Sequence, residues 1–474
     1  MRKLSALLAA VCAAAMMLAS CENVSLPEES SGRSVSSRDM FNGNESLLPS
    51  PPDESGSTEV QKITVLSEHP GRFLVDDETP QALTGRLHER NAYIESVYGA
   101  DIQTKSVNYD TAAQEIRAAM QSGEYGCEIL ALSAGNTAKL WSEGLLYDMR
   151  ELSGFDIGSS VFEQGKADSL ATNKSVYMLP DDSTYYFDEI GVFFCNRDLL
   201  DASLPDPEQL CIDGKWTWDR FAEHCRASYN ISESSNRYGY GYYTMQDYVV
   251  AFWDSAGKPM IKDTNMNPVR LAMPSGEMQQ LSFDLFKYWN VRYKYDYGEA
   301  RALKQFRSND ALFLWHRLGY FRSLRDGAEE GLNYFVLPMP KFDESQEGYS
   351  SLVGRDALVY SLPANLAQRN SKTKTRVLAI LMVNCAAGAN SFKRAYVGSM
   401  IADYLVNNNE TLVMQEIVDS ATFDFAYVFS PVAKPVRDVT TYALEQFFHV
   451  GSYVGATVDY GLKKFEEYSD EHFK

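Results

Sequence analysis

The chain has 474 residues, of which 64 are acidic and 44 are basic, and its formal net charge is −20. This charge argues against nucleic acid and against an anionic membrane surface as direct partners. The roughly 415 residues that follow position 59 are too many for one simple core and are enough for two lobes.

The first 21 residues have the layout of a secretion signal. Arg2 and Lys3 precede an almost wholly apolar stretch from Leu4 to Leu18, and Ala-Ser-Cys21 follows. The stretch is shorter than the roughly 20 residues of a spanning helix, so the order indicates a signal peptide. Leu-Ala-Ser-Cys resembles the bacterial lipobox, and we expect a mature chain that starts at a lipidated (palmitate-type) Cys21. Two or three acyl chains give lasting membrane attachment; an ordinary signal peptide with a chance cysteine is the alternative.

Residues 22–59 are dense in Ser, Pro, Glu and Asn and contain few apolar side chains. Such a segment buries too little surface to fold, so we expect a disordered tether. No later apolar stretch is long enough to span a bilayer.

The cysteines do not form a recognisable framework. If Cys21 is lipidated, an odd number remains, with no CxxC and no zinc-like spacing: Cys127, Cys195, Cys211, Cys225 and Cys385. We expect buried free thiols, with a Cys211–Cys225 pair as the alternative. The six His are scattered without metal-ligand spacing, so we expect neither a metal nor a cofactor.

After the tether, strand and helix patterns alternate. The hydrophobic patterns predict strands at 61–67, 101–108 and 127–133, and helices over 83–97, 112–120 and 136–145. Alternation of this length implies parallel strand pairing with right-handed crossovers, and therefore a three-layer α/β lobe.

The second half begins with an apolar run near Val176 that breaks at Pro180. The run resumes as a strand at 189–195, and the acidic, aromatic DDSTYYFDE between the two parts is a candidate crossing between lobes. Thr217 is a good N-cap for a helix that follows it, with Asp219 in the first turn. Later patterns predict strands at 334–337 and 357–362, a helix over 372–385 and a helical, aromatic region from Ser391 onward.

Several sequence blocks carry a family resemblance. CNRDLLDASLPDPEQ followed by GKWTWDRF, and later NYFVLPMPKFDESQEGYSS, resemble extracellular solute-binding proteins of family 1. These are receptors of ABC importers, many of them specific for sugars and oligosaccharides. The segment SFKRAYVGSMIADYLVNNNETLVMQEIVDSATFDFAYVF resembles the lipoprotein subset common in Gram-positive anaerobes.

The resemblance covers about residues 60–474 and implies an α/β fold of two lobes, periplasmic-binding-protein-like and of type II. Each lobe would be a mixed sheet flanked by helices, with the ligand in the cleft between lobes. It implies a first lobe of residues 60–182 and 353–398 and a second lobe of residues 188–352 and 399–474.

Sugars are bound by aromatic rings stacked on their C–H faces and by polar side chains aimed at their hydroxyls. From the resemblance, the expected cleft residues are Glu68, His69 and Asn136 of the first lobe, Asp182, Tyr185, Tyr186 and Glu189 of the crossing, Gln246, Tyr248, Trp253, Trp315 and Arg317 of the second lobe, and Arg355 and Asp356 after the second crossing. Trp315 is the predicted stacking platform. For each aromatic residue, plain core packing is the alternative, and we expect Trp216 and Trp218 to be structural because they open a helix.

The sequence therefore predicts a substrate-binding lipoprotein of an ABC importer, anchored on the extracytoplasmic face of the cell membrane. It would capture a sugar or oligosaccharide and deliver it to permease subunits. A glycosidase with paired carboxylates and a cell-surface adhesin are the alternatives. No GxSxG, HExxH, P-loop or GxGxxG motif is present, so we expect no enzyme. Polyols, sugar acids and short peptides remain open as ligands.

Overall fold

The computed structural model describes residues 40–41, 44–52, 60–77, 79, 81–123, 126–162, 164–172, 175–232, 235–242, 244–259, 275–289, 294–295, 299–326, 332–403, 405, 407–433, 463–464 and 467. All of them belong to one compact unit, Ser37–Lys474.

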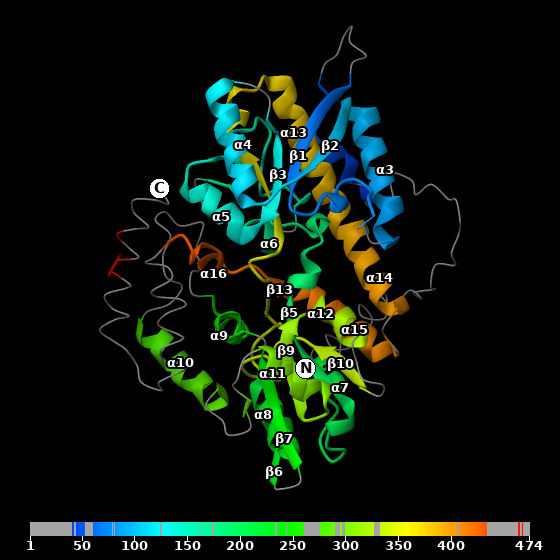
Figure 1. Ribbon diagram of the computed structural model, residues 1–474, viewed down its shortest axis with the longest axis vertical. Coiled ribbons are helices and arrows are strands. Elements are labelled where there is room, and N and C mark those ends of the chain that lie inside the picture. Colours follow the sequence, from blue (N-terminus) through cyan, green and yellow to red (C-terminus); the bar gives the residue numbers. More distant parts are fainter. Residues whose placement is uncertain are drawn as a thin grey trace, which may run out of the picture. The chain divides into compact units, whose positions relative to one another are not determined.

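A five-stranded sheet with the order β2-β1-β3-β12-β4 organises the first lobe (Figure 1). Its strands are β1 (Gln61–Ser67), β2 (Ala100–Ser106), β3 (Ile129–Ser133), β4 (Leu146–Tyr147) and β12 (Leu358–Pro363). β1 pairs in parallel with β2 and β3, whereas β12 runs antiparallel to β3 and β4.

Helices cover both faces of this sheet. Successive strand side chains point to opposite faces, and apolar side chains on both faces are buried against helices. The helices are α3 (Gln81–Tyr98), α4 (Tyr109–Ser122), α5 (Ala134–Ser142), the short α6 (Gln164–Ala167) and α13 (Ser371–Ala387). Val65 of β1 shares a core with Leu87 of α3 and Ile380 of α13. The next residue, Leu66, shares the opposite core with Ile116 of α4. The first lobe is thus a three-layer α/β sandwich.

A second sheet, with the order β10-β5-β9-β7-β6 and β8 beside β7, organises the second lobe. Its strands are β5 (Gly191–Asn196), β6 (Asn230–Ser232), β7 (Ser235–Tyr242), β8 (Lys294–Tyr295), β9 (Ala311–Arg317) and β10 (Tyr334–Leu337). Every residue of β5 and β9 is buried. The helices around it are α7 (Pro207–Ile212), α8 (Trp218–Ser228), α9 (Met245–Asp254), α10 (Ser275–Trp289), α11 (Glu299–Arg307), α12 (Tyr320–Asp326) and α15 (Asn408–Asp419).

Three short segments, here called the connecting segments, lie between the sheets: 182–190, 352–357 and 421–429. The first contains the 3-10 helices η4 (Asp182–Thr184) and η5 (Tyr186–Glu189). The second follows β11 (Ser351–Leu352), which pairs in parallel with β13 (Ala421–Thr422) of the third. The third ends in α16 (Phe425–Phe429), which packs against α5 of the first lobe. A separate helical route, α13, η8 (Gly388–Phe392) and α14 (Lys393–Asp403), also leads from the first sheet toward α15.

The predicted elements are largely confirmed. The strands at 61–67 and 334–337 have the predicted bounds, and Thr217 caps α8 by accepting a hydrogen bond from the Arg220 amide. The apolar run near Val176 forms only an isolated bridge, Leu179 to Tyr360, and not a regular strand. It lies next to Pro180, which has no amide hydrogen to donate to a ladder. The lobe boundaries remain a prediction, although every strand of both sheets lies inside its predicted range.

The five described cysteines are free and buried, including Cys211 and Cys225. Burial raises the pKa of all five thiols, Cys127 and Cys211 among them, so they are poor nucleophiles. Among the residues that the structure describes, no helix is long and apolar enough to cross a membrane, and no cluster of His, Cys, Asp and Glu could hold a metal ion.

Candidate functional site

Polar side chains follow the carboxyl ends of the strands of the first sheet. Glu68 comes directly after β1 and accepts hydrogen bonds from the Ser133 amide (2.7 Å) and from Nδ2 of Asn136 (2.6 Å). Asn136 is in the first turn of α5, directly after β3. Parallel strands end at one edge of a sheet, where α/β proteins commonly bind ligands. Glu68 and Asn136 are half-buried there, and His69 is exposed beside them.

Charged side chains of the second lobe and of the first connecting segment lie close together. Glu189 precedes β5, Arg317 ends β9, and Asp247 lies in the first turn of α9. Nη2 of Arg317 is 3.1 Å from Oδ2 of Asp247, and Nε of Arg317 is 3.9 Å from Oε2 of Glu189. Arg317 is only 9% exposed, so water screens these two charge interactions weakly.

Arg355 and Tyr427 join this group from outside the second sheet. The carbonyl of Arg355 accepts a hydrogen bond from the Gly135 amide (3.0 Å), which fixes its backbone to the first lobe. Its guanidinium lies 3.8 Å from Oδ1 of Asp247 and 4.7 Å from the ring centroid of Tyr427. The Tyr427 hydroxyl donates to Asp247 and accepts from Nη2 of Arg317 (3.2 Å).

We call Glu189, Asp247, Arg317, Arg355 and Tyr427 the Asp247 cluster. Its residues come from α9 and β9 of the second lobe and from all three connecting segments, and the backbone of Arg355 is hydrogen-bonded to Gly135 of the first lobe. A carboxylate between two guanidinium groups and a phenol offers several donors and acceptors within a small volume. The cluster can therefore bind the polar groups of a small solute.

Asp247 and Arg317 hold each other in the ionised state. Burial would raise the pKa of Asp247, but Arg317, the Tyr427 hydroxyl and Arg355 outweigh it and lower that pKa. Burial would likewise lower the pKa of Arg317, but Tyr427, Asp247 and Glu189 raise that pKa instead. Burial raises the pKa of Tyr427 to about 12, so its hydroxyl stays protonated and can donate. Burial also raises the pKa of Glu189, with Arg317 opposing the shift.

The aromatic residues predicted for the cleft pack inside the second lobe. Trp315 is 0% exposed and contacts the Tyr248 ring, with centroids 5.4 Å apart, because every side chain of β9 is buried. Tyr248 is also fully buried, and Nε1 of Trp253 donates to the Lys258 carbonyl at 2.8 Å. None of these three rings offers an open face for stacking in this conformation.

The predicted residues of the first connecting segment are enclosed as well. Asp182 is 1% exposed, forms an ion pair with Lys166 (3.4 Å) and accepts from the Tyr186 hydroxyl (2.7 Å). Tyr185 is buried against Tyr396, with ring centroids 5.2 Å apart. These contacts hold the first connecting segment in place.

Two members of the cluster were missed by the sequence analysis, Asp247 and Tyr427. Asp247 had a local signal, since it follows the N-cap Thr244 and acidic residues favour a helix N-terminus. Tyr427 had none beyond its aromatic character. Asp356 is exposed near Glu189 and adds to the rise of the Glu189 pKa. The side chain of Gln246 and all of Cys21 lie outside the described residues.

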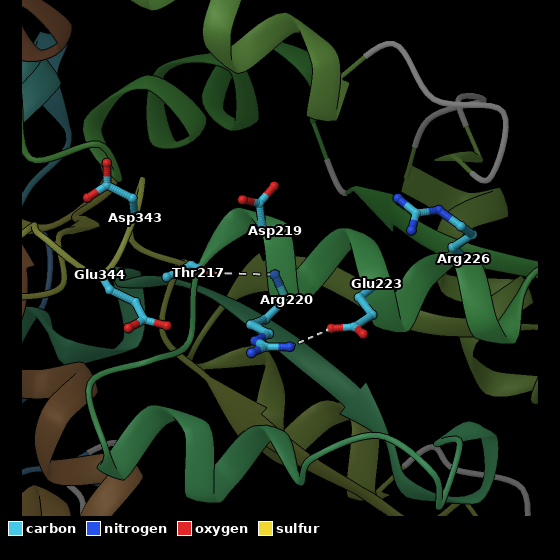
Figure 2. A pocket seen from close by; sticks show the side chains of 7 residues that line it. All are labelled: Thr217, Asp219, Arg220, Glu223, Arg226, Asp343 and Glu344. Carbon is cyan, nitrogen blue, oxygen red and sulfur yellow. Dashed lines mark hydrogen bonds and ion pairs between the residues drawn. The ribbon is translucent and has the colours of Figure 1, made fainter.

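A hollow of about 490 Å³ lies on α8 of the second lobe, and it shares no residue with the Asp247 cluster (Figure 2). Its lining consists of Thr217, Asp219, Arg220, Glu223, Arg226, Asp343 and Glu344. Arg220 and Glu223 pair with each other at 2.8 Å, and Thr217 is occupied as the N-cap. Both members of that ion pair are more than a third exposed, as is usual for a solvated helix face.

The sequence profile of the bacterial extracellular solute-binding protein family matches residues 85–345, which is more than half of the chain. The chain belongs to this family. Comparison with curated protein sequences gives no match.

Solved structures of similar fold include a cyclo/maltodextrin-binding protein in complex with maltotetraose, at 14% identity and a TM-score of 0.57, covering 88% of this chain and 98% of that one. A sugar transporter from Rhizobium etli in an open conformation has 13% identity and a TM-score of 0.56, with 87% and 99% covered. UgpB of Mycobacterium tuberculosis in complex with glycerophosphocholine has 15% identity and a TM-score of 0.52, with 88% and 100% covered. At these identities the likeness establishes the fold, that of two-lobed solute-binding proteins.

Proposed function

We propose that this solute-binding protein captures a carbohydrate between its lobes and delivers it to the permease of an ABC importer. The observation that carries the proposal is the approach of Arg355 to Asp247. The first is held by its backbone to the first lobe, and the second starts α9 of the second lobe. A solute bound beside this pair would touch both lobes and favour their closed arrangement through its differential affinity.

A sugar or oligosaccharide fits the chemistry of the accessible side chains. Carboxylates, an amide and a guanidinium are the groups that bind hydroxyls in both donor and acceptor roles. We propose as contacts the predicted Glu68, His69, Asn136, Glu189 and Arg355, together with Asp247. The ligands in two solved structures of similar fold, maltotetraose and glycerophosphocholine, are polyhydroxylated or derived from a polyol, which agrees with this class.

Ring stacking has a smaller part in this proposal than the sequence suggested. Trp315, Tyr248 and Trp253 are enclosed by protein, so the affinity would come from hydrogen bonds at the ends of the two sheets. Arg317 is nearly enclosed too, and its nitrogen atoms are engaged with Glu189, Asp247 and Tyr427. We therefore leave these four residues out of the proposed contacts.

We further propose that the mature chain is a lipoprotein attached through Cys21 to the extracytoplasmic face of the membrane. The signal layout supports the attachment, and the family name itself places the protein outside the cytoplasm. The family consists of binding proteins, so we also propose that the chain does not hydrolyse its ligand.

The test is titration calorimetry of the full chain with maltotetraose, other oligosaccharides, free sugars, polyols and sugar acids, with product analysis after long incubation. Glu68→Gln should lower the affinity for the best ligand about tenfold, since a neutral amide replaces a carboxylate acceptor worth roughly 1.5 kcal/mol. The ligands should be recovered intact. Small-angle scattering should show a smaller radius of gyration in the bound state.

The matched control is Glu115→Gln, because Glu115 also forms a polar contact, to Lys105, but lies on α4. This variant should bind like the wild type. Equal affinities of all three proteins would show that the site lies elsewhere. If none of the saccharides or polyols binds to the folded protein, the carbohydrate class is wrong.

A further inference from the structure

The three connecting segments are hydrogen-bonded to one another through their backbones. The Gly354 amide of the second segment donates to the Glu189 carbonyl of the first at 2.8 Å. The Val353 amide donates to the Thr422 carbonyl of the third, also at 2.8 Å. Ile190 and Val353 form an antiparallel bridge beside them. The segments thus form a small ladder between the two sheets.

One side chain, that of Arg317, contacts all three connecting segments. Nη1 of Arg317 donates to the Glu189 carbonyl of the first segment at 3.3 Å, and Nη2 donates to the Tyr427 hydroxyl of the third at 3.2 Å. A Cβ atom on Gly354 of the second segment would lie 2.7 Å from Cζ of Arg317. The guanidinium therefore fills the space that a side chain at position 354 would need.

The same guanidinium is tied to the second lobe. Arg317 is the last residue of β9, a central strand of the second sheet. Its guanidinium forms an ion pair at 3.1 Å with Asp247, which lies at the start of α9. A planar guanidinium with five donors can serve several acceptors at once, which an ammonium group cannot do with the same geometry. Removing one partner of this nearly buried network would leave a charged group unpaired, which lowers stability.

We infer that Arg317 is a positioning residue that fixes the geometry of the three connecting segments relative to the second sheet. By holding them together it sets the path along which the lobes can move, and it does so without touching the ligand. The inference goes beyond the proposed function and does not depend on which solute is bound.

Hydrogen exchange of the ligand-free full chain tests it, with mass-spectrometric readout of peptides and urea unfolding of the same samples. Arg317→Lys keeps the charge and removes the fork. We expect amides of the three segments, Gly354 and Val353 among them, to exchange about tenfold faster in a concerted way. Peptides from β1 in the first lobe should keep their wild-type exchange.

A second variant reaches the same contact from the other side. Gly354→Ala should displace the guanidinium without altering any charge, and we expect it to accelerate exchange in the same three segments. Its matched control is Gly348→Ala, because a Cβ at Gly348 would meet nothing within 4 Å. A control for the arginine is Arg197→Lys, which alters an ion-paired arginine bound to Glu208 and Glu410 inside the second lobe. Neither control should change the connecting segments.

Faster exchange restricted to β9 in Arg317→Lys, or an equal increase in β1, would overturn the inference. The first result would make Arg317 a local packing residue, and the second a general stabiliser. If Arg317→Lys does not fold, Gly354→Ala decides alone: unchanged exchange of residues 186–190 and 421–429 would contradict the inference. Failure of the calorimetric test above would leave this exchange pattern unaffected, so the two proposals fail separately.

Discussion

At the scale of single residues, two buried tryptophans differ in their hydrogen bonding. Trp315 and Trp216 are both 0% exposed, although only Trp315 was predicted to meet the ligand. The two side chains differ in the hydrogen bonding of the indole nitrogen Nε1. Nε1 of Trp216 donates to the Pro338 carbonyl at 3.1 Å, whereas Nε1 of Trp315 has no hydrogen-bond partner among the described residues. A buried donor without a partner lowers stability, because its hydration is lost without replacement.

This difference predicts unequal costs for the same substitution. Trp216→Phe should lower the free energy of unfolding by about 1–3 kcal/mol more than Trp315→Phe, since it also leaves the Pro338 carbonyl unpaired. Both variants lose similar packing, so each is the control for the other. Urea unfolding of the two proteins measures the difference. A larger loss for Trp315→Phe would indicate that its indole N–H has a partner after all.

At the scale of elements, α16 supplies Tyr427 to the Asp247 cluster. Its N-cap Asp424 accepts a hydrogen bond from the Tyr427 amide at 2.6 Å and so orients the residue that donates to Asp247. Burial raises the pKa of Asp424 to about 7, and the nearby Asp254 adds to the rise. The Asp254 carboxylate accepts from Ser350 and Thr422, so two buried acids lie where the second and third connecting segments meet.

The raised pKa of Asp424 determines whether stability rises or falls with pH. Between about pH 4 and pH 7 the folded chain binds a proton at Asp424 that the unfolded chain has lost, so the free energy of unfolding falls as pH rises. Asp424→Asn keeps an acceptor for the Tyr427 amide and removes this titration. We expect the variant to gain stability relative to wild type as pH rises through this range. Urea unfolding at pH 4, 5.5 and 7.5 tests this, and a constant difference across the range would refute it.

At the scale of the whole molecule, the two sheets are joined by short segments and by the α13–α14 route. Such arrangements make relative motion of lobes the default expectation. What the fold adds is a set of hydrogen bonds among the connecting segments, with charged side chains of both lobes next to them. The proposed solute site therefore lies next to the connecting segments about which the lobes would close.

The proposed membrane attachment also belongs to this scale. Cys21→Ser should move the protein from the membrane fraction to the medium or leave it unprocessed, because no thiol remains to carry the lipid. Fractionation of expressing cells with immunoblotting measures this, and Ser20→Ala is the control because it keeps a small residue before Cys21. A Cys21→Ser protein that is processed normally and still sediments with membranes would contradict lipidation.

Local sequence patterns predicted most strands and helices of the first sheet, and several sequence blocks indicated the family, but the run near Val176 forms only an isolated bridge. Hydrophobic alternation and helix caps are local signals, so β1, α3 and the Thr217 cap could be read from short stretches of chain. The acidic, aromatic composition of residues 181–189 likewise indicated the first connecting segment, because polar residues between apolar runs rarely continue a strand.

The sequence could not predict which side chains meet in the folded chain. Tyr427 is 180 residues from Asp247 along the chain, and no local pattern reports a hydrogen bond at that separation. Aromatic residues are equally suited to a core and to a sugar site, since both reward burial of a large apolar face. The position of Trp315 became visible only with β9, which is central in its sheet and buried along its whole length. The strand packs the Trp315 ring against Tyr248 and brings Arg317 to the connecting segments.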